Sequence, residues 1–130
     1  MPDVKASNVP NVGTTTDAVH VQGNIKRTLL EKTEFPDGYV LNTSIIEVPA
    51  GTSASPHTHP GIETGYVIGG EFYLCIEGQP DQHQVLGSSY TIPADAVHYA
   101  KVPGPDPLKV LCFFVVNDTK PLATVEKTAP

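Results

Sequence analysis

Turn-forming residues interrupt this chain at short intervals, and their spacing restricts the fold more than any other feature. The 130 residues include 13 prolines and 11 glycines, and the segments between them are rich in β-branched and aromatic residues, which favour strands. We expect strands over residues 26–32, 39–48, 55–59, 65–68, 71–77, 84–86, 90–92, 98–102 and 108–116. Strands this short and this numerous indicate an all-β sandwich or barrel.

The chain divides into three parts by composition. Residues 1–24 are polar with scattered valines and predict a flexible N-terminal arm. Residues 25–118 hold all the expected strands and form one β domain, and residues 119–130 form a C-terminal tail. A chain of 130 residues is long enough for one domain with its own core and too short for two.

Charge and hydropathy exclude two kinds of partner. The net charge of −6 without a Lys/Arg cluster argues against nucleic acid, and no apolar run approaches the roughly 18 residues of a membrane span. The first residues lack the apolar segment of a signal peptide. We therefore expect a cytoplasmic protein, or a periplasmic one if a signal peptide has been removed, whose partner is a small molecule.

Alternation along the strands predicts which side chains face the core. In residues 71–77 the apolar side chains of Phe72, Leu74 and Ile76 share one face, which should point inward. In residues 108–116, Lys109 should face water, which turns Cys112 and Phe114 inward. Cys75 and Cys112 then lie on opposite faces, so a disulfide is not expected and a reducing compartment is favoured.

The opposite face of residues 108–116 carries Leu111, Phe113 and Val115 and is too apolar to face water. A second subunit or the N-terminal arm could cover it. We expect a homodimer.

Four potential metal ligands gather in two short segments. His57 and His59 are two residues apart, which places both side chains on one face of an extended strand. Glu63 follows a Pro60–Gly61 turn that can bring its carboxylate back towards them, and His98 lies further along the chain. Three imidazoles and one carboxylate suit a divalent transition metal and leave positions open for water or substrate.

Each of these residues also has a structural interpretation. A lone His-x-His pair could be two polar residues on a solvent face, and a lone buried His98 could be a core residue. Glu63 could bind the metal or hold another ligand in place. His20 and His83 lie in polar stretches and are expected on the surface.

Both segments resemble the cupin family. Gly51, His57, His59, Glu63 and Gly70 fit the first cupin motif, Gly-x5-His-x-His-x3-Glu-x6-Gly, at every fixed position. The second motif, Gly-x5-Pro-x-Gly-x2-His-x3-Asn, is matched by Gly87, Pro93 and His98, while Asp95 and Val102 stand where the family has glycine and asparagine. The resemblance implies a double-stranded β-helix, or jelly-roll, barrel.

The resemblance also implies a function. His57, His59, Glu63 and His98 would hold one divalent ion (Fe, Mn, Ni, Cu or Zn), and Glu63 could also act as a catalytic base. Phe72, Cys112 and Phe114 are candidates for the cavity wall. A dioxygenase of the quercetin-dioxygenase type is the first model. A metal-dependent isomerase, lyase or decarboxylase without redox chemistry is the second, and a non-catalytic ligand-binding cupin is the third.

Overall fold

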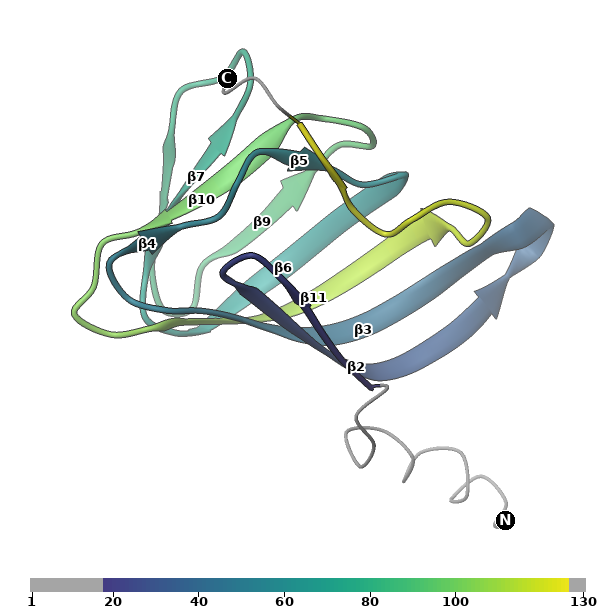
Figure 1. The fold of residues 1–130 in the computed structure, drawn as a ribbon, viewed down its shortest axis with the longest axis horizontal. Coiled ribbons are helices and arrows are strands. Elements are labelled where there is room, and N and C mark those ends of the chain that lie inside the picture. The colour runs from purple at the N-terminus through teal and green to yellow at the C-terminus, as the bar shows by residue number, and fades with distance from the viewer. Residues whose placement is uncertain (1–17, 127–130) are drawn as a thin grey trace, which may run out of the picture.

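The computed structural model describes residues 18–126, which form strands joined by turns and one short 3-10 turn, η3 (Pro36–Gly38) (Figure 1). The strands are β1 (Val19–Gln22), β2 (Ile25–Phe35), β3 (Tyr39–Val48), β4 (Thr52–Ser53), β5 (His57–Thr58), β6 (Gly61–Gly69), β7 (Phe72–Ile76), β8 (Gln82–Gln84), β9 (Ser89–Ile92), β10 (His98–Val102), β11 (Leu108–Asn117) and β12 (Thr124–Val125). The prediction of an all-β fold is confirmed. Within residues 18–126, no helix has the length and hydropathy needed to cross a bilayer.

The strands form two antiparallel sheets. The first has the order β1-β2-β3-β11-β6-β9, and the second has the order β12-β5-β10-β7-β8, with β4 paired to β10. In Figure 1 the long strands β2, β3, β11 and β6 lie side by side below, while β5, β10 and β7 lie above them. Chain neighbours such as β6 and β7 belong to different sheets, as in a jelly roll, so the two inner faces meet in one core.

The core follows the predicted alternation. Phe72, Leu74 and Ile76 on β7 are buried, and on β11 both Cys112 and Phe114 are fully buried. Lys109 on the same strand is exposed, so the predicted phase of β11 is correct. Cys75 and Cys112 are both buried and free.

Two boundaries of the predicted domain differ from the structure. Residues 1–24 were expected to form an arm, but Val19–Gln22 form β1 and pair with the start of β2, where Gln22 lies opposite Ile25. The expected tail over residues 119–130 contains β12, which pairs with β5. Composition does not reveal such strands, because each is short and mostly exposed and depends on its partner for its hydrogen bonds. Residues 1–17 and 127–130 lie outside the described residues.

The expected strand over residues 55–59 is reduced to His57–Thr58. Pro56 precedes this pair and Pro60 follows it after His59; neither has an N–H to donate, which limits sheet pairing on both sides. His57 still lies opposite His98 in the pairing of β5 with β10, which sets both side chains on one face.

The departure from the second cupin motif at Asp95 has a structural counterpart. Asp95 has φ of 62°, in the left-handed region that glycine occupies at least cost. Aspartate tolerates this region better than most residues, so the turn before His98 forms without the glycine. Its backbone N–H donates to the carbonyl of His59 at 3.1 Å, which ties the turn to the first motif.

Candidate metal centre

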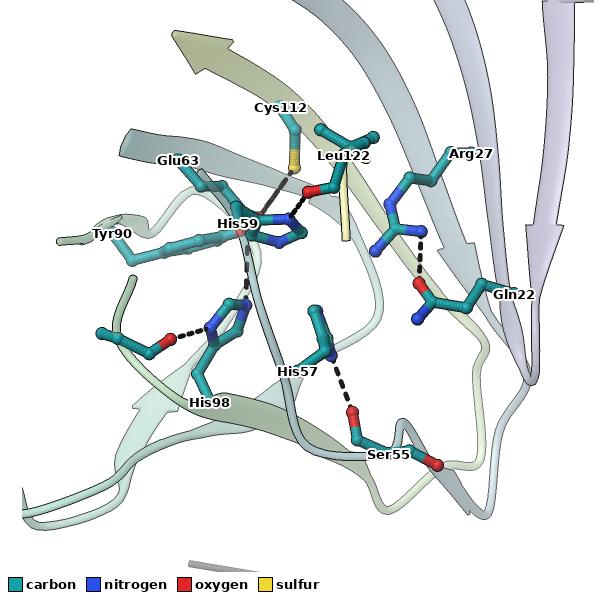
Figure 2. A network of polar contacts seen from close by, with 11 residues as sticks. Gln22, Arg27, Ser55, His57, His59, Glu63, Tyr90, His98, Cys112 and Leu122 are labelled. Atoms are coloured by element: carbon teal, nitrogen blue, oxygen red, sulfur yellow. Dashed lines mark hydrogen bonds and ion pairs between the residues drawn. The ribbon is translucent and has the colours of Figure 1, made fainter. Parts of the chain in front are cut away.

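Both sheets contribute side chains to one buried polar group between them (Figure 2). His57 and His98 come from β5 and β10 of the second sheet, His59 from the turn after β5, and Glu63 from β6 of the first sheet. All four are buried, with 2–5% of their surface exposed. The potential ligand atoms of the three histidines lie within 4.8 Å of one another, so the structure brings together all four residues that the sequence singled out.

The three imidazole rings are held in one tautomer by the backbone. Nδ1 of His57 lies 2.7 Å from the carbonyl oxygen of Ser55, Nδ1 of His59 lies 2.8 Å from that of Leu122, and Nδ1 of His98 lies 2.9 Å from that of Ala96. A carbonyl oxygen only accepts hydrogen bonds, so each neutral ring must carry its proton on Nδ1 and donate it. Each Nε2 is then left with a free lone pair, the arrangement that metal-binding histidines adopt.

The Nε2 atoms support the same interpretation. Those of His59 and His98 are buried and have no hydrogen-bond partner among the described residues, although burial of an unpaired nitrogen is costly. Glu63 Oε1 lies 3.1 Å from Nε2 of His59 and 3.7 Å from Nε2 of His98, without the alignment of a hydrogen bond. The nitrogen and carboxylate lone pairs point towards one another without forming hydrogen bonds, an arrangement that a divalent cation between them would satisfy. The donor set therefore suits the metal that the sequence predicts.

The two carboxylate oxygens of Glu63 have different partners. Oε1 faces the histidines, while Oε2 accepts a hydrogen bond from the Tyr90 hydroxyl at 2.8 Å. The Cys112 thiol lies 3.5 Å from the same Oε2 and 3.3 Å from the Tyr90 oxygen. Glu63 can therefore present a single oxygen to an ion, and the other oxygen is oriented by two neutral donors.

Burial sets the protonation of these donors. Burial, followed by the negative charge of Glu63, raises the pKa of Tyr90 well above its usual value, and the same two causes raise the pKa of Cys112. Burial alone would raise the pKa of Glu63, but the contacts with His59 and His98, which favour the ionised carboxylate whenever these rings also carry a proton on Nε2, outweigh it and lower that pKa well below its usual range. Near neutral pH, Glu63 is ionised while Tyr90 and Cys112 keep their protons.

Gly65 makes room for the Tyr90 ring. Tyr90 lies opposite Gly65 in the pairing of β6 with β9, and a Cβ at position 65 would come within 2.4 Å of the ring. The ring therefore lies across β6, where its hydroxyl reaches Glu63 two residues earlier on the strand.

The protonation of His57 is strongly opposed by its surroundings. Burial, together with the neighbouring His98, lowers the pKa of His57 from 6.5 to about 3, although its bond to Ser55 acts in the opposite direction. The ring is therefore neutral at every ordinary pH and available as a ligand.

A cavity of about 40 Å³ adjoins the four residues. His57, His98 and Glu63 line it on one side, Phe72 and Tyr90 contribute aromatic walls, and aliphatic side chains complete it. The sequence named Phe72, Cys112 and Phe114 for this wall, but Cys112 and Phe114 do not line it. They sit behind the polar group instead, Cys112 against Glu63 and Phe114 against the ring of His59.

Three contacts around the candidate site were not anticipated from the sequence. Arg27 lines the cavity with its side chain almost fully buried, Tyr90 orients Glu63, and the Leu122 carbonyl holds His59. The alternation of Ile25 and Arg27 on β2 was the available signal for Arg27, whereas a backbone carbonyl leaves no trace in a sequence. His20 and His83 are exposed, as predicted.

The jelly-roll fold and the buried group of three histidines with a nearby glutamate define a cupin with a possible metal site. The chain belongs to the cupin family, since the family model described as "Cupin domain" matches residues 44–114. That range contains all four candidate ligands. A comparison with curated proteins found no match.

Several solved structures share the fold. KdgF from a Halomonas species is 26% identical, with a TM-score of 0.59 over 77% of this chain and 88% of its own. An RmlC-like cupin from Shewanella frigidimarina is 22% identical, with a TM-score of 0.58 over 78% of this chain and 87% of its own. The DMSP lyase DddQ from Ruegeria pomeroyi is 18% identical, with a TM-score of 0.66 over 88% of this chain, but the match spans only 59% of the lyase.

Proposed function

We propose that this cupin binds one divalent transition metal ion through the Nε2 atoms of its three histidines and Oε1 of Glu63, and that it is a metal-dependent enzyme acting on a small organic substrate. The observation that carries the proposal is the set of three Nδ1–carbonyl bonds, which aim three unprotonated nitrogens at one point. An ion held there would act as a Lewis acid on a substrate oxygen.

Non-redox chemistry, as in an isomerase, lyase or decarboxylase, is supported best. Glu63 is an ionised carboxylate beside the cavity whose second oxygen is oriented by Tyr90. It can take a proton from a substrate carbon and return it.

Oxygen-dependent chemistry is the second candidate. The ligand set of three histidines and one carboxylate resembles that of non-haem iron oxygenases. A substrate as large as a flavonol does not fit a cavity of about 40 Å³, which is well below the roughly 150 Å³ that accommodates benzene in an engineered core. The quercetin-dioxygenase model therefore needs a different, smaller substrate here.

Metal analysis followed by two activity assays tests the proposal. Protein purified without added metal should carry a divalent transition metal, measured by mass spectrometry. In D2O the metal-loaded protein should catalyse exchange of the protons next to the carbonyl of small oxo compounds, followed by NMR, and Glu63→Gln should lose this exchange. Oxygen consumption without proton exchange would move the second candidate ahead. Metal without either activity would indicate a ligand-binding cupin, and a wild type that takes up no divalent ion would refute the proposal.

We also propose that the chain is a homodimer formed through the outer face of the first sheet. Phe113 is 37% exposed there, and its neighbours on β6, Ile62 and Tyr66, are 45% and 48% exposed. Aromatic and aliphatic side chains exposed side by side mark an interaction surface. Light scattering at low micromolar concentration should give the mass of a dimer, and Phe113→Glu should give a monomer, while Glu77→Lys, at an exposed position beside β7 of the other sheet, serves as a charge-changing control. A monomeric wild type would exclude this interface.

A further inference from the structure

A buried cation faces the same cavity as the candidate metal ligands. Arg27 lies on β2 of the first sheet with only 3% of its surface exposed, and its side chain lines the cavity. In Figure 2 its guanidinium group extends from its strand towards the histidines. Arginine is rarely buried to this degree without an anionic partner.

The hydrogen bonds of Arg27 are incomplete. One terminal nitrogen donates to Oε1 of Gln22 at 2.7 Å, and this acceptor is a neutral amide (Figure 2). The Nε atom is buried and has no hydrogen-bond partner in the described structure. Among residues 18–126, no carboxylate lies within ion-pair distance of Arg27. A guanidinium group left in this condition matches the geometry of a carboxylate, which accepts two parallel N–H bonds.

The charges around the cavity also favour an anion. The ionisable lining residues besides Arg27 are Glu63, the two histidines and two tyrosines. The positive charge of Arg27 and the negative charge of Glu63 cancel, so no negative charge in the cavity lining would neutralise the two positive charges of a bound metal ion. An anionic ligand would supply the missing negative charge, in a site where little water is present to screen the attraction. The protein as a whole carries a net charge of −6, so this preference is local to the cavity.

We propose that Arg27 is the anion-binding residue of the cavity and that the substrate is a small carboxylic acid, whose carboxylate lies against the guanidinium while its other end faces the histidines. The contact between the other end of the acid and the histidine site rests on the metal function proposed above. The contact between the carboxylate and Arg27 requires no metal. The cavity of about 40 Å³ limits the acid to a few non-hydrogen atoms.

Glycolate and its neutral isostere glycolamide test this assignment by calorimetric titration. Both are small enough for the cavity, and they differ in the negative charge. Each is titrated into metal-free and metal-loaded protein, because the metal-free sample removes chelation by the ion. The wild type should bind glycolate at least about tenfold more tightly than glycolamide, since a hydrogen bond to a charged group contributes about 1.5–3 kcal/mol.

Three variants assign the difference to Arg27. Arg27→Gln should weaken glycolate roughly 10- to 100-fold and leave glycolamide unchanged, and Arg27→Lys should fall between Arg27→Gln and the wild type because it keeps the charge without the planar fork. Gln22→Glu places a competing carboxylate against the guanidinium and should weaken glycolate in the same way. Lys109→Gln removes an exposed positive charge and is the matched control, with wild-type binding expected.

The outcomes are decisive in both directions. Equal affinity for glycolate and glycolamide, no measurable glycolate binding to the wild type, or unchanged glycolate binding in Arg27→Gln would each overturn the proposal. If Arg27→Gln does not fold, the proposal is tested by glycolate binding to Gln22→Glu and by the ratio of the wild-type affinities for glycolate and glycolamide. Metal content is measured on the same samples. A wild type without metal that still prefers glycolate refutes the metal function and supports the role of Arg27.

Discussion

His59→Ala and His98→Ala are expected to lose metal by roughly 100-fold or more relative to the wild type after identical dialysis. Each change removes one of three nitrogen ligands, and the loss of a residue that merely orients a ligand already costs 10- to 100-fold in affinity. Glu63→Gln should cause a smaller loss, because an amide oxygen can still coordinate but brings no charge. Mass spectrometry of the dialysed proteins measures the metal bound per chain.

The folded core should survive these changes. Phe72, Leu74 and Ile76 and the buried face of β11 carry the packing, and Phe114 on that face also packs against the ring of His59. Circular dichroism should therefore stay that of a β protein. His20→Ala and His83→Ala remove exposed histidines and are the matched controls, with full metal content expected. Full metal content in His59→Ala and His98→Ala would show that the buried histidines are structural.

The second large effect is a loss of stability of the metal-free protein as the pH falls below 6.5. The buried His57 ring has a pKa of about 3, against 6.5 for an ordinary histidine, chiefly because burial opposes its charge. Between these two values the unfolded chain takes up a proton that the folded chain does not, so acid favours unfolding. The contribution of His57 is complete above pH 6.5 and is lost as the pH falls to about 3.

The size of this effect is large for a single residue. One proton corresponds to about 1.4 kcal/mol per pH unit, so the full shift amounts to about 4–5 kcal/mol, a large share of the 5–15 kcal/mol that stabilises a typical domain. Urea unfolding of metal-free protein at pH 7, 6 and 5 measures the slope. His57→Gln should reduce the slope of unfolding free energy against pH by the equivalent of one proton, about 1.4 kcal/mol per pH unit. His83→Gln should leave the slope unchanged. A wild-type slope no steeper than that of His57→Gln would contradict the assignment.

Much of the fold could be predicted because period-two alternation and turn residues act locally. The apolar side chains of β7 and β11 gave the correct inner faces, and the motif spacing gave the four residues that meet between the sheets. The pairing of His57 with His98 follows from the family resemblance, since strands 40 residues apart leave no local signal of their contact.

The residues that were missed depend on tertiary contacts. Arg27 follows Lys26, so the sequence shows two adjacent cations, and only the alternation with Ile25 indicates which of them faces inward. A register shift between Leu29 and Glu31 limits that alternation to the start of β2. Tyr90 reaches Glu63 only because Gly65 has no side chain. The strands β1 and β12 are too short for an alternation of their own, so the sequence predicts an arm and a tail there.

The bond from His59 to Leu122 spans 63 residues of sequence and imposes an order on synthesis. A nascent chain that has displayed both motifs but not yet Leu122 can already pair its sheets, yet the imidazole of His59 is still free to carry its proton on either nitrogen. β12, which holds this segment against β5, also emerges after all the strands that form the core. On the ribosome, the proposed ion would thus find a finished binding site only after the fold around it is nearly complete.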